Sequence, residues 1–260
     1  MFTEAFVASE RNAVYVPFPV APEGLGEAVA GLRALGVAGF NVTVPHKQAI
    51  LDLLDEAEPD ARAIGAVNTV VRDGNRLVGF NTDAPGLVRA LLEAHVKLHK
   101  ERAVVLGAGG AARAAVVGLA RAGVAQVAVI ARDPGKAMRL VKEVEGSSRG
   151  TWLLSPKTNT EITSAFSQAA IVIQATSATM KEGIAREFVE TIPWTAISDS
   201  AVAMDMVYQP LDTVFLQRAR TRGLRTVDGL GMLLYQGALA YERWCNQPAP
   251  IEAMRKALGG

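Results

Sequence analysis

The sequence predicts an α/β protein with two parts, a mixed α/β lobe followed by a doubly wound parallel sheet. Three observations predict this. Beyond about residue 85, short apolar runs alternate regularly with segments of helical periodicity. A glycine-rich turn, GAGGAARA, follows the first of these runs, and before it lies a β-rich pair of runs around Asp73-Gly74. We expect the first lobe to span residues 1–84, the second domain 85–230, and the helices of 231–260 to pack back on the first lobe.

The composition excludes several classes of protein. Of the 260 residues, 50% are hydrophobic and 20% are charged, as in an ordinary globular chain and unlike a disordered one. Lysine and arginine number 27 against 26 aspartates and glutamates, for a net charge of +1. So balanced a charge favours neither a nucleic acid nor an acidic membrane surface as partner.

Cysteine and histidine usage excludes two further kinds of site. Cys245 is the single cysteine, so no disulfide framework can form within one chain, and a reducing compartment fits. The expected role of the Cys245 side chain is packing. His46, His95 and His99 show no metal-ligand spacing, and we expect no metal. No apolar run approaches the ~18 residues of a membrane span, and MFTEAFVASER lacks signal-peptide regions. The predicted location is the cytoplasm.

The first lobe reads as alternating strands and helices. Apolar runs predict strands, and helical spacing predicts helices between them. The expected elements are a strand at 13–20 (AVYVPFPV), a helix at 24–36, a strand at 38–44 stopped by Pro45, a helix at 46–57, and a hairpin within 68–83.

The second part begins with a connecting helix at 84–98 and continues as a series of short apolar strands. The expected strands are 102–107, 126–132, 151–155, 169–176, 203–208 and 224–228, with helices between most of them. Short apolar strands separated by helices predict a parallel sheet covered on both faces, the Rossmann arrangement that binds dinucleotides. Two more helices are expected at 231–245 and 250–258.

The turn after the first of these strands has the spacing G-x-G-x-x-A. Gly107 permits the tight turn, Gly109 lets the backbone approach a pyrophosphate, and Ala112 allows close packing of helix on strand. The free N–H groups and the positive end of the helix favour an anion. The predicted cofactor-binding turn comprises Gly107, Ala108, Gly109, Gly110 and Ala111. The other reading is that such a turn serves packing alone.

The second strand ends in ARDPGK, where the adenosine ribose of a dinucleotide is expected. Arg132 and Lys136 offer two cations suited to the 2′-phosphate of NADP, and an acid here would favour NAD. NADP is therefore predicted. The carboxylate of Asp133 would repel the phosphate if it turned inward. The alternative is that Arg132, Asp133 and Lys136 all face water and bind no cofactor.

Three polar clusters, NVTVPHK, AIGAVNTV and GFNTD, stand at the expected ends of strands in the first lobe. Taken singly, Asn, Thr and Asp beside turns usually satisfy local backbone groups. Three such clusters ahead of one cofactor turn favour a ligand site.

These clusters, together with GAGGAARA, ARDPGK, DMVYQP and DGLGMLLYQGALAYERW, resemble the shikimate dehydrogenase family in order over nearly the whole chain. The resemblance implies an N-terminal substrate lobe, a C-terminal NADP lobe and a cleft between them. Shikimate and 3-dehydroshikimate are the implied substrates, in aromatic amino-acid biosynthesis.

The resemblance also implies residue roles. Lys47 stands at the position of the family's catalytic lysine, and Asp83 at that of its paired aspartate. A cation and proton source near the ketone would stabilise the charge that develops on oxygen. The implied substrate-binding residues are Thr43, Asn68, Tyr208 and Gln236, and Thr176, Gly229 and Met232 are implied near the cofactor. Packing is the other reading of Met232.

The sequence departs from the family pattern in two places. The family has a β-strand and a Ser-x-Ser loop that binds the substrate carboxylate ahead of the helix with which MFTEAF aligns. We hypothesise either an earlier natural start or a natural truncation with weak activity; without the segment the lobe leaves an edge or apolar surface uncovered. The second departure is QATSATM at 174–180, where the family usually has Asn-Ala-Thr-Pro-Leu-Gly-Met; Thr176 is retained.

Two other functions stay open at this point. One is a relative acting on quinate or a similar cyclohexane acid with either cofactor. The other is a non-catalytic NADP-binding protein, against which the retained Lys47 and Asp83 argue. The chain is expected to be a monomer or a homodimer.

Overall fold

The computed structural model describes residues 1–148 and 150–259. The chain divides into two compact units. Unit 1 comprises Met1–Gly86 and Leu233–Gly260, and unit 2 comprises Leu87–Met232. The first lobe is thus completed by the end of the chain.

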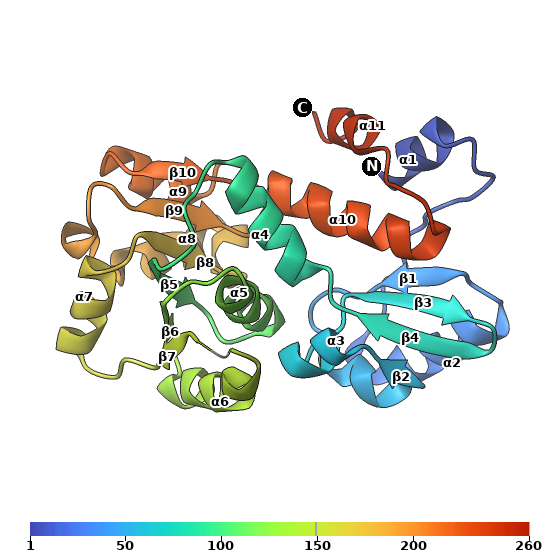
Figure 1. The fold of residues 1–260 in the computed structure, drawn as a ribbon, viewed down its shortest axis with the longest axis horizontal. Coiled ribbons are helices and arrows are strands. Elements are labelled where there is room, and N and C mark those ends of the chain that lie inside the picture. The colour runs from blue at the N-terminus through green and yellow to red at the C-terminus, as the bar shows by residue number, and fades with distance from the viewer. Residues whose placement is uncertain (149, 260) are drawn as a thin grey trace. The chain divides into compact units, whose positions relative to one another are not determined.

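Unit 2 is built on a six-stranded sheet in the order β10-β9-β8-β5-β6-β7, in which every pair of neighbours is parallel (Figure 1). The strands are β5 Arg102–Leu106, β6 Gln126–Ile130, β7 Trp152–Leu154, β8 Ile171–Gln174, β9 Val202–Asp205 and β10 Arg225–Val227. The chain starts in the middle with β5, winds outward through β6 and β7, and then returns to β8 on the other side. This is the Rossmann order, whose switch point lies between β5 and β8. The predicted doubly wound sheet is confirmed.

Helices cover both faces of this sheet. Alternate residues of a strand point to opposite faces, yet both Ala103 and Val104 of β5 are buried, as are Ile171 and Val172 of β8. On one face Val104 and Val172 share a core with Phe166 and other residues of the helices that follow. The helices between and after the strands are α5 Gly110–Arg121, α6 Pro134–Val144, α7 Asn159–Ser167, α8 Glu182–Glu190 and α9 Val214–Thr221. Helix α4, Asp83–Glu93, begins in unit 1 and ends in unit 2 ahead of β5. Short 3-10 turns lie at Glu145–Ser147, Ala178–Met180 and Trp194–Ala196.

Unit 1 contains a four-stranded sheet in the order β1-β3-β4-β2. Its strands are β1 Gly39–Asn41, β2 Glu56–Ala57, β3 Thr69–Asp73 and β4 Arg76–Phe80. β3 and β4 form the predicted hairpin, in which Asp73 pairs with Arg76 and Gly74 has a positive φ of 59°. β1 joins antiparallel to β3, and β2 joins parallel to β4.

Helices pack against this sheet and against one another in unit 1. They are α1 Phe2–Ala8, a 3-10 turn Pro22–Gly24, α2 Leu25–Ala34, α3 Pro59–Ile64, α10 Leu230–Cys245 and α11 Ile251–Lys256. One core joins α2 to the sheet through Val29, Val70 and Leu77. A second joins α1 to α10 and α11, which lie close together in Figure 1. In this core the rings of Phe6 and Tyr241 are 5.8 Å apart between centroids.

The predicted strand at 13–20 is wrong, because this segment is irregular chain in the structure. A strand needs a hydrogen-bonding neighbour, and no described strand pairs with the segment. It is held instead by Tyr15, whose ring stacks on Phe2 at 4.4 Å between centroids and whose hydroxyl donates to Asn41 Oδ1 at 3.0 Å. Val14, Val16 and Phe18 stay 85%, 52% and 60% exposed.

The predicted helix at 46–57 is also mostly wrong. Only a 3-10 helix, Ala49–Leu53, forms there, and Leu54 turns to an extended conformation. The segment then enters β2, which pairs with β4, and Asp55 Oδ2 accepts a hydrogen bond from the Leu77 backbone N–H at 2.6 Å. Pairing with the sheet therefore overrides the helical spacing of the sequence.

None of the helices among the described residues has the length and apolar character needed to cross a membrane.

Candidate active site and dinucleotide site

Unit 1 brings together the lysine and the aspartate predicted to carry the chemistry. Lys47 Nζ lies 2.7 Å from Asp83 Oδ2, and the two side chains are 15% and 6% exposed. Lys47 lies in the turn that follows β1, and Asp83 is the first residue of α4. A buried ion pair in this geometry holds the amine in one place and keeps it partly shielded from water.

Asn68 is the hub of the same cluster. Its side-chain N–H₂ group donates to Asp83 Oδ1 at 2.8 Å and to Thr82 Oγ1 at 2.9 Å, and its Oδ1 accepts from the Thr82 backbone N–H at 2.8 Å. Asn81 caps the start of α4, because its Oδ1 accepts from the N–H groups of Asp83 and Ala84 at 3.1 and 3.2 Å. The aspartate is thus fixed from both sides.

Gln236 joins this cluster from α10, whereas Thr43 does not. Gln236 Oε1 lies 3.5 Å from Asn68 Nδ2, and a Cβ on Gly86 would fall 2.8 Å from the Gln236 backbone N, so glycine lets α4 and α10 approach closely. Thr43 is exposed just before the turn that contains Lys47, and its carbonyl accepts from the His46 N–H at 2.9 Å.

The predicted glycine turn lies at the switch point of the unit 2 sheet. Gly107 has a φ of +126°, and a Cβ there would meet Thr176 Cγ2 at 2.9 Å and the Ala175 carbonyl oxygen at 3.1 Å. Any other residue would be strained and would clash with the chain leaving β8. The turn therefore lies at the switch point, the position at which doubly wound sheets generally bind ligands.

The start of α5 is open to a ligand. Gly109 is the N-cap residue of α5, and a Cβ placed on it would meet nothing within 4 Å. Ala108, Gly110 and Ala111 are half-buried beside it, and Ala112 is fully buried. The first N–H groups of a helix have no acceptor within it, so this backbone can receive a phosphate.

Asp133 does not turn toward the predicted phosphate cations. Its Oδ1 accepts from the Gly135 backbone N–H at 2.8 Å and so caps α6. Arg132 and Lys136 are exposed around this cap. The Asp133 carboxylate is therefore engaged by the N-terminus of α6, so its hydrogen bond does not oppose a phosphate beside Arg132 and Lys136.

The remaining predicted residues lie in unit 2 at the ends of its strands and at the start of α10. Thr176 is half-buried after β8. Gly229 packs so closely that a Cβ would lie 2.7 Å from the Val207 carbonyl oxygen. Met232 is buried at 7%, and Tyr208 is 48% exposed after β9.

A buried polar pair in unit 2 was missed by the sequence prediction. Gln174 and Asp205 are 0% exposed at the ends of β8 and β9, and Gln174 Nε2 lies 3.2 Å from Asp205 Oδ1. Burial raises the pKa of the Asp205 carboxyl, and hydrogen bonds from Val207 and Thr213 oppose the shift. The available signal was a polar residue at the carboxyl end of two otherwise apolar strands.

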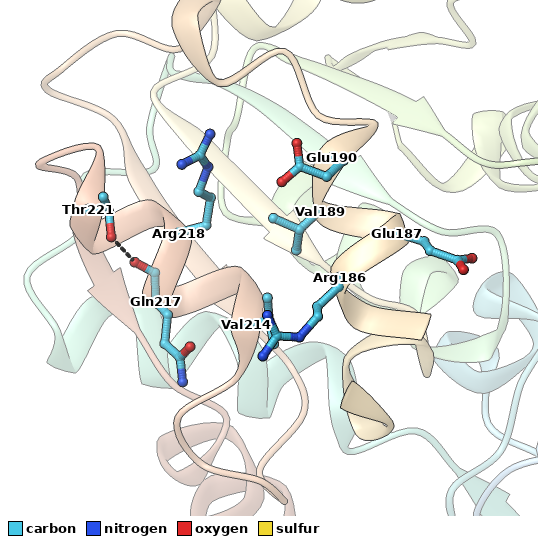
Figure 2. Close-up of a pocket in the computed structure, with 8 residues that line it drawn as sticks. All are labelled: Arg186, Glu187, Val189, Glu190, Val214, Gln217, Arg218 and Thr221. Atoms are coloured by element: carbon cyan, nitrogen blue, oxygen red, sulfur yellow. Dashed lines mark hydrogen bonds between the residues drawn. The ribbon is translucent and has the colours of Figure 1, made fainter. Parts of the chain in front are cut away.

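A hollow elsewhere in unit 2 contains none of the predicted residues. Figure 2 shows it between α8 and α9, where Val189 and Val214 lie among exposed charged and polar side chains. Arg186 and Arg218 are offset by Glu187 and Glu190, so the lining favours no ligand charge.

Family models match most of the chain. A shikimate dehydrogenase substrate binding domain matches residues 1–70, a shikimate/quinate 5-dehydrogenase domain 89–207, and a shikimate 5′-dehydrogenase C-terminal domain 229–258. These segments include the cluster around Lys47 and Asn68 and the glycine turn.

Individual relatives agree with these matches. The NADP⁺-dependent shikimate dehydrogenase of Desulforamulus reducens is 41% identical over 259 residues, 99% of this chain and 88% of the relative. The shikimate 5-dehydrogenase of Thermus thermophilus, solved with NADP(H) and shikimate, superposes with a TM-score of 0.85 at 33% identity, covering 99% of this chain and 92% of its own. Quinate dehydrogenase of Corynebacterium glutamicum, solved with NAD, gives 0.82 at 27%, covering 97% and 90%. The chain belongs to the shikimate dehydrogenase family.

Proposed function

We propose that this protein is an NADP-dependent shikimate dehydrogenase, which reversibly reduces 3-dehydroshikimate to shikimate with NADPH. The observation that carries the proposal is the Lys47–Asp83 ion pair, 2.7 Å long and held by Asn68. A module that only bound a nucleotide would need no such pair. Family membership and the NADP-dependent relatives support the same assignment.

The pair suits the reduction of a ketone. NADPH, when bound, would supply a hydride to the carbonyl carbon, and negative charge would then develop on the carbonyl oxygen. The Lys47 ammonium stabilises this charge and donates a proton to the oxygen, giving the hydroxyl of shikimate. Asp83 orients the amine and accepts a hydrogen bond from a ring hydroxyl. In the oxidative direction Lys47 receives the proton back.

The residues of unit 2 fit a dinucleotide. Gly107, Ala108, Gly109, Gly110 and Ala111 would hold the pyrophosphate, because the backbone is open there and the N–H groups of α5 are available.

Other unit 2 residues would hold the two ends of the cofactor. Arg132 and Lys136 would bind the 2′-phosphate, with Arg132 able to use two parallel hydrogen bonds. Thr176, Gly229 and Met232 would lie along the nicotinamide.

The substrate would be read by short polar side chains. Asn68 and Gln236 already point into the cluster around Asp83, and with Thr43 and Tyr208 they would hydrogen-bond the ring hydroxyls and the carboxylate. We further propose that the protein works in the cytoplasm as a monomer or homodimer; the single cysteine suits a reducing compartment.

Steady-state kinetics with two substrates and two cofactors tests the proposal. Shikimate and quinate are each combined with NADP⁺ and with NAD⁺, and formation of the reduced cofactor is followed by absorbance. We expect shikimate with NADP⁺ to give the highest kcat/KM.

The other results identify the alternatives. A higher kcat/KM for quinate would assign the chain to the activity of its quinate dehydrogenase relative. Binding of NADPH by a folded sample with no turnover of either acid would reject catalysis and favour a binding protein. Equal KM for NADPH and NADH would reject the cofactor preference.

A further inference from the structure

Gln174 and Asp205 occupy opposite positions on the neighbouring strands β8 and β9 of the unit 2 sheet. They are register partners at the last residues of β8 and β9, and both are fully buried. Their side chains contact each other, with Gln174 Nε2 3.2 Å from Asp205 Oδ1. The pair therefore connects the two chain segments that leave the sheet here.

Gln174 fixes the turn after β8. Its Oε1 accepts from both the backbone N–H and the hydroxyl of Thr176, at 2.6 and 2.7 Å. Its Nε2 lies 2.8 Å from Thr179 Oγ1 and 2.9 Å from the Thr176 carbonyl oxygen. One amide thus sets both the backbone and the side-chain orientation of Thr176.

The turn that Gln174 fixes is the one that contacts the glycine turn. Thr176 Cγ2 lies where a Cβ on Gly107 would clash, at 2.9 Å. Thr176 also accepts a hydrogen bond from the Ala178 N–H at 3.0 Å. Thr176 therefore lies directly against Gly107, and its own position is set by Gln174 and by the Ala178 N–H.

Asp205 fixes the segment after β9 in the same way. Its Oδ1 accepts from the Val207 N–H at 2.9 Å, and its Oδ2 from the Thr213 hydroxyl at 2.7 Å. The Val207 carbonyl is the group against which Gly229 packs. The carboxylate therefore determines where Gly229 can lie.

We propose that Gln174 and Asp205 are a positioning pair that places Thr176 and Gly229 for the nicotinamide half of the cofactor. The inference rests on the proposed NADP-dependent function. The pair acts through the two backbones it holds, and its partners are amide, hydroxyl and main-chain groups. Shape and hydrogen bonding carry the effect.

The test compares two ligands on purified full-length variants. NADPH carries both halves of the cofactor, whereas 2′,5′-ADP carries only the adenosine half and its phosphates. Gln174→Met keeps the length of the side chain and removes its polar groups. We expect NADPH to bind about tenfold more weakly to this variant, as misplaced binding groups cost affinity, and 2′,5′-ADP to bind within about twofold of wild type. Gln168→Met, on the exposed surface after α7, is the matched control and should change neither.

Asp205→Asn tests the geometric basis of the pair. Asparagine can still accept from Val207 and contact Thr213, so NADPH affinity should stay close to wild type, whereas Asp205→Ala should resemble Gln174→Met. Unchanged NADPH affinity in Gln174→Met, or equal losses for both ligands, would overturn the proposal.

A milder variant covers the case in which Gln174→Met does not fold. Thr179→Val removes one partner of the amide at constant volume, and a selective loss for NADPH supports the pair, while an unchanged ratio of the two affinities rejects it. Both readouts are binding measurements. A wild-type protein without shikimate turnover would thus defeat the proposed function without deciding this one.

Discussion

Each unit has a buried aspartate in a polar cluster near the ends of its strands, and the two aspartates differ in the charge of their partners. In unit 1, Asp83 faces the Lys47 ammonium at 2.7 Å. In unit 2, Asp205 is more deeply buried, and its carboxylate accepts from an amide, a hydroxyl and a main-chain N–H. Unit 2 also has two cations that are predicted to bind the cofactor. They are Arg132 and Lys136, which are exposed after β6 and at the start of α6.

The difference separates two tasks. An ammonium beside a carboxylate offers a proton and a charge, which a reaction at a carbonyl needs. The Asp205 carboxyl has no ammonium beside it among its hydrogen-bond partners in the described part of the chain. Its hydrogen bonds from an amide, a hydroxyl and a main-chain N–H instead hold backbone segments in position. Burial of a carboxyl therefore does not by itself identify a catalytic residue. The charge of its hydrogen-bond partner is the more informative feature.

The largest expected effect comes from breaking the unit 1 cluster at its acid. Asp83→Asn removes the charge that orients the Lys47 amine and keeps the side chain's shape. We expect kcat for shikimate oxidation to fall by about 10²-fold, within the usual contribution of a positioned acid/base group. Asp52→Asn, at an exposed position of the 3-10 helix Ala49–Leu53 in unit 1, is the control and should keep wild-type kcat. A loss below threefold in Asp83→Asn would show that the pair is structural.

Removing the cations of Arg132 and Lys136 should change the preference between NADPH and NADH without changing the hydride-transfer reaction. In the double variant Arg132→Ala and Lys136→Ala, we expect the preference for NADPH over NADH, as the ratio of kcat/KM, to fall by about 10- to 100-fold, because charge-assisted hydrogen bonds to the phosphate are lost. Lys142→Ala on the same helix α6 is the matched control. Equal losses with both cofactors would argue against a 2′-phosphate site here.

The pH dependence of stability should differ in sign between a carboxyl of each unit. Burial raises the pKa of Asp205 above 3.8, so its stabilising contribution is present at low pH and is lost as the pH rises through the raised value. The Leu77 N–H and Arg33 lower the pKa of Asp55, so its contribution is present above 3.8 and is lost as the pH falls through the lowered value.

Thermal denaturation from acid to neutral pH checks both directions. The Tm of Asp205→Asn should gain on wild type as the pH rises above 3.8, and that of Asp55→Asn should fall behind. Parallel Tm curves for Asp205→Asn and wild type would contradict the burial of an ionisable group in unit 2.

The smallest expected effect concerns Asp133. Asp133→Ala removes the side-chain acceptor that caps α6 at 2.8 Å, at a cost of about 1 kcal/mol in the free energy of unfolding, measured by urea denaturation. Because the carboxylate faces the helix, NADPH affinity should stay within about twofold of wild type. A marked gain in NADPH affinity would show that Asp133 acts on the phosphate instead.

The sheet of unit 2 was largely predictable from the sequence, and the first lobe only in part. Strands buried on both faces appear as uninterrupted apolar runs, as in β5 and β8, and the helices between them restrict the topology. The run at 13–20 has the same composition, but composition does not say whether a neighbouring strand is present. In 46–57, pairing of β2 with β4 decided the outcome.

The candidate site was predictable where a motif combined with a local spacing. The glycine turn needed only its own residues and the strand before it, and Lys47, Asp83, Asn68 and Gln236 came through the family resemblance. The Gln174–Asp205 contact joins residues 31 positions apart through adjacent strands, and nothing in either local sequence indicates which polar groups will meet. Such contacts depend on register, which the three-dimensional structure supplies.

The most direct test of the account is the kinetics of Lys47→Met, measured together with NADPH affinity. Methionine preserves an unbranched, flexible side chain and removes the ammonium. Lys97→Met, which removes a surface lysine paired with Glu101, is the matched control. We predict that kcat for shikimate oxidation falls by at least about 10²-fold while the NADPH dissociation constant stays within about twofold of wild type. A kcat within threefold of wild type would contradict a catalytic role for Lys47.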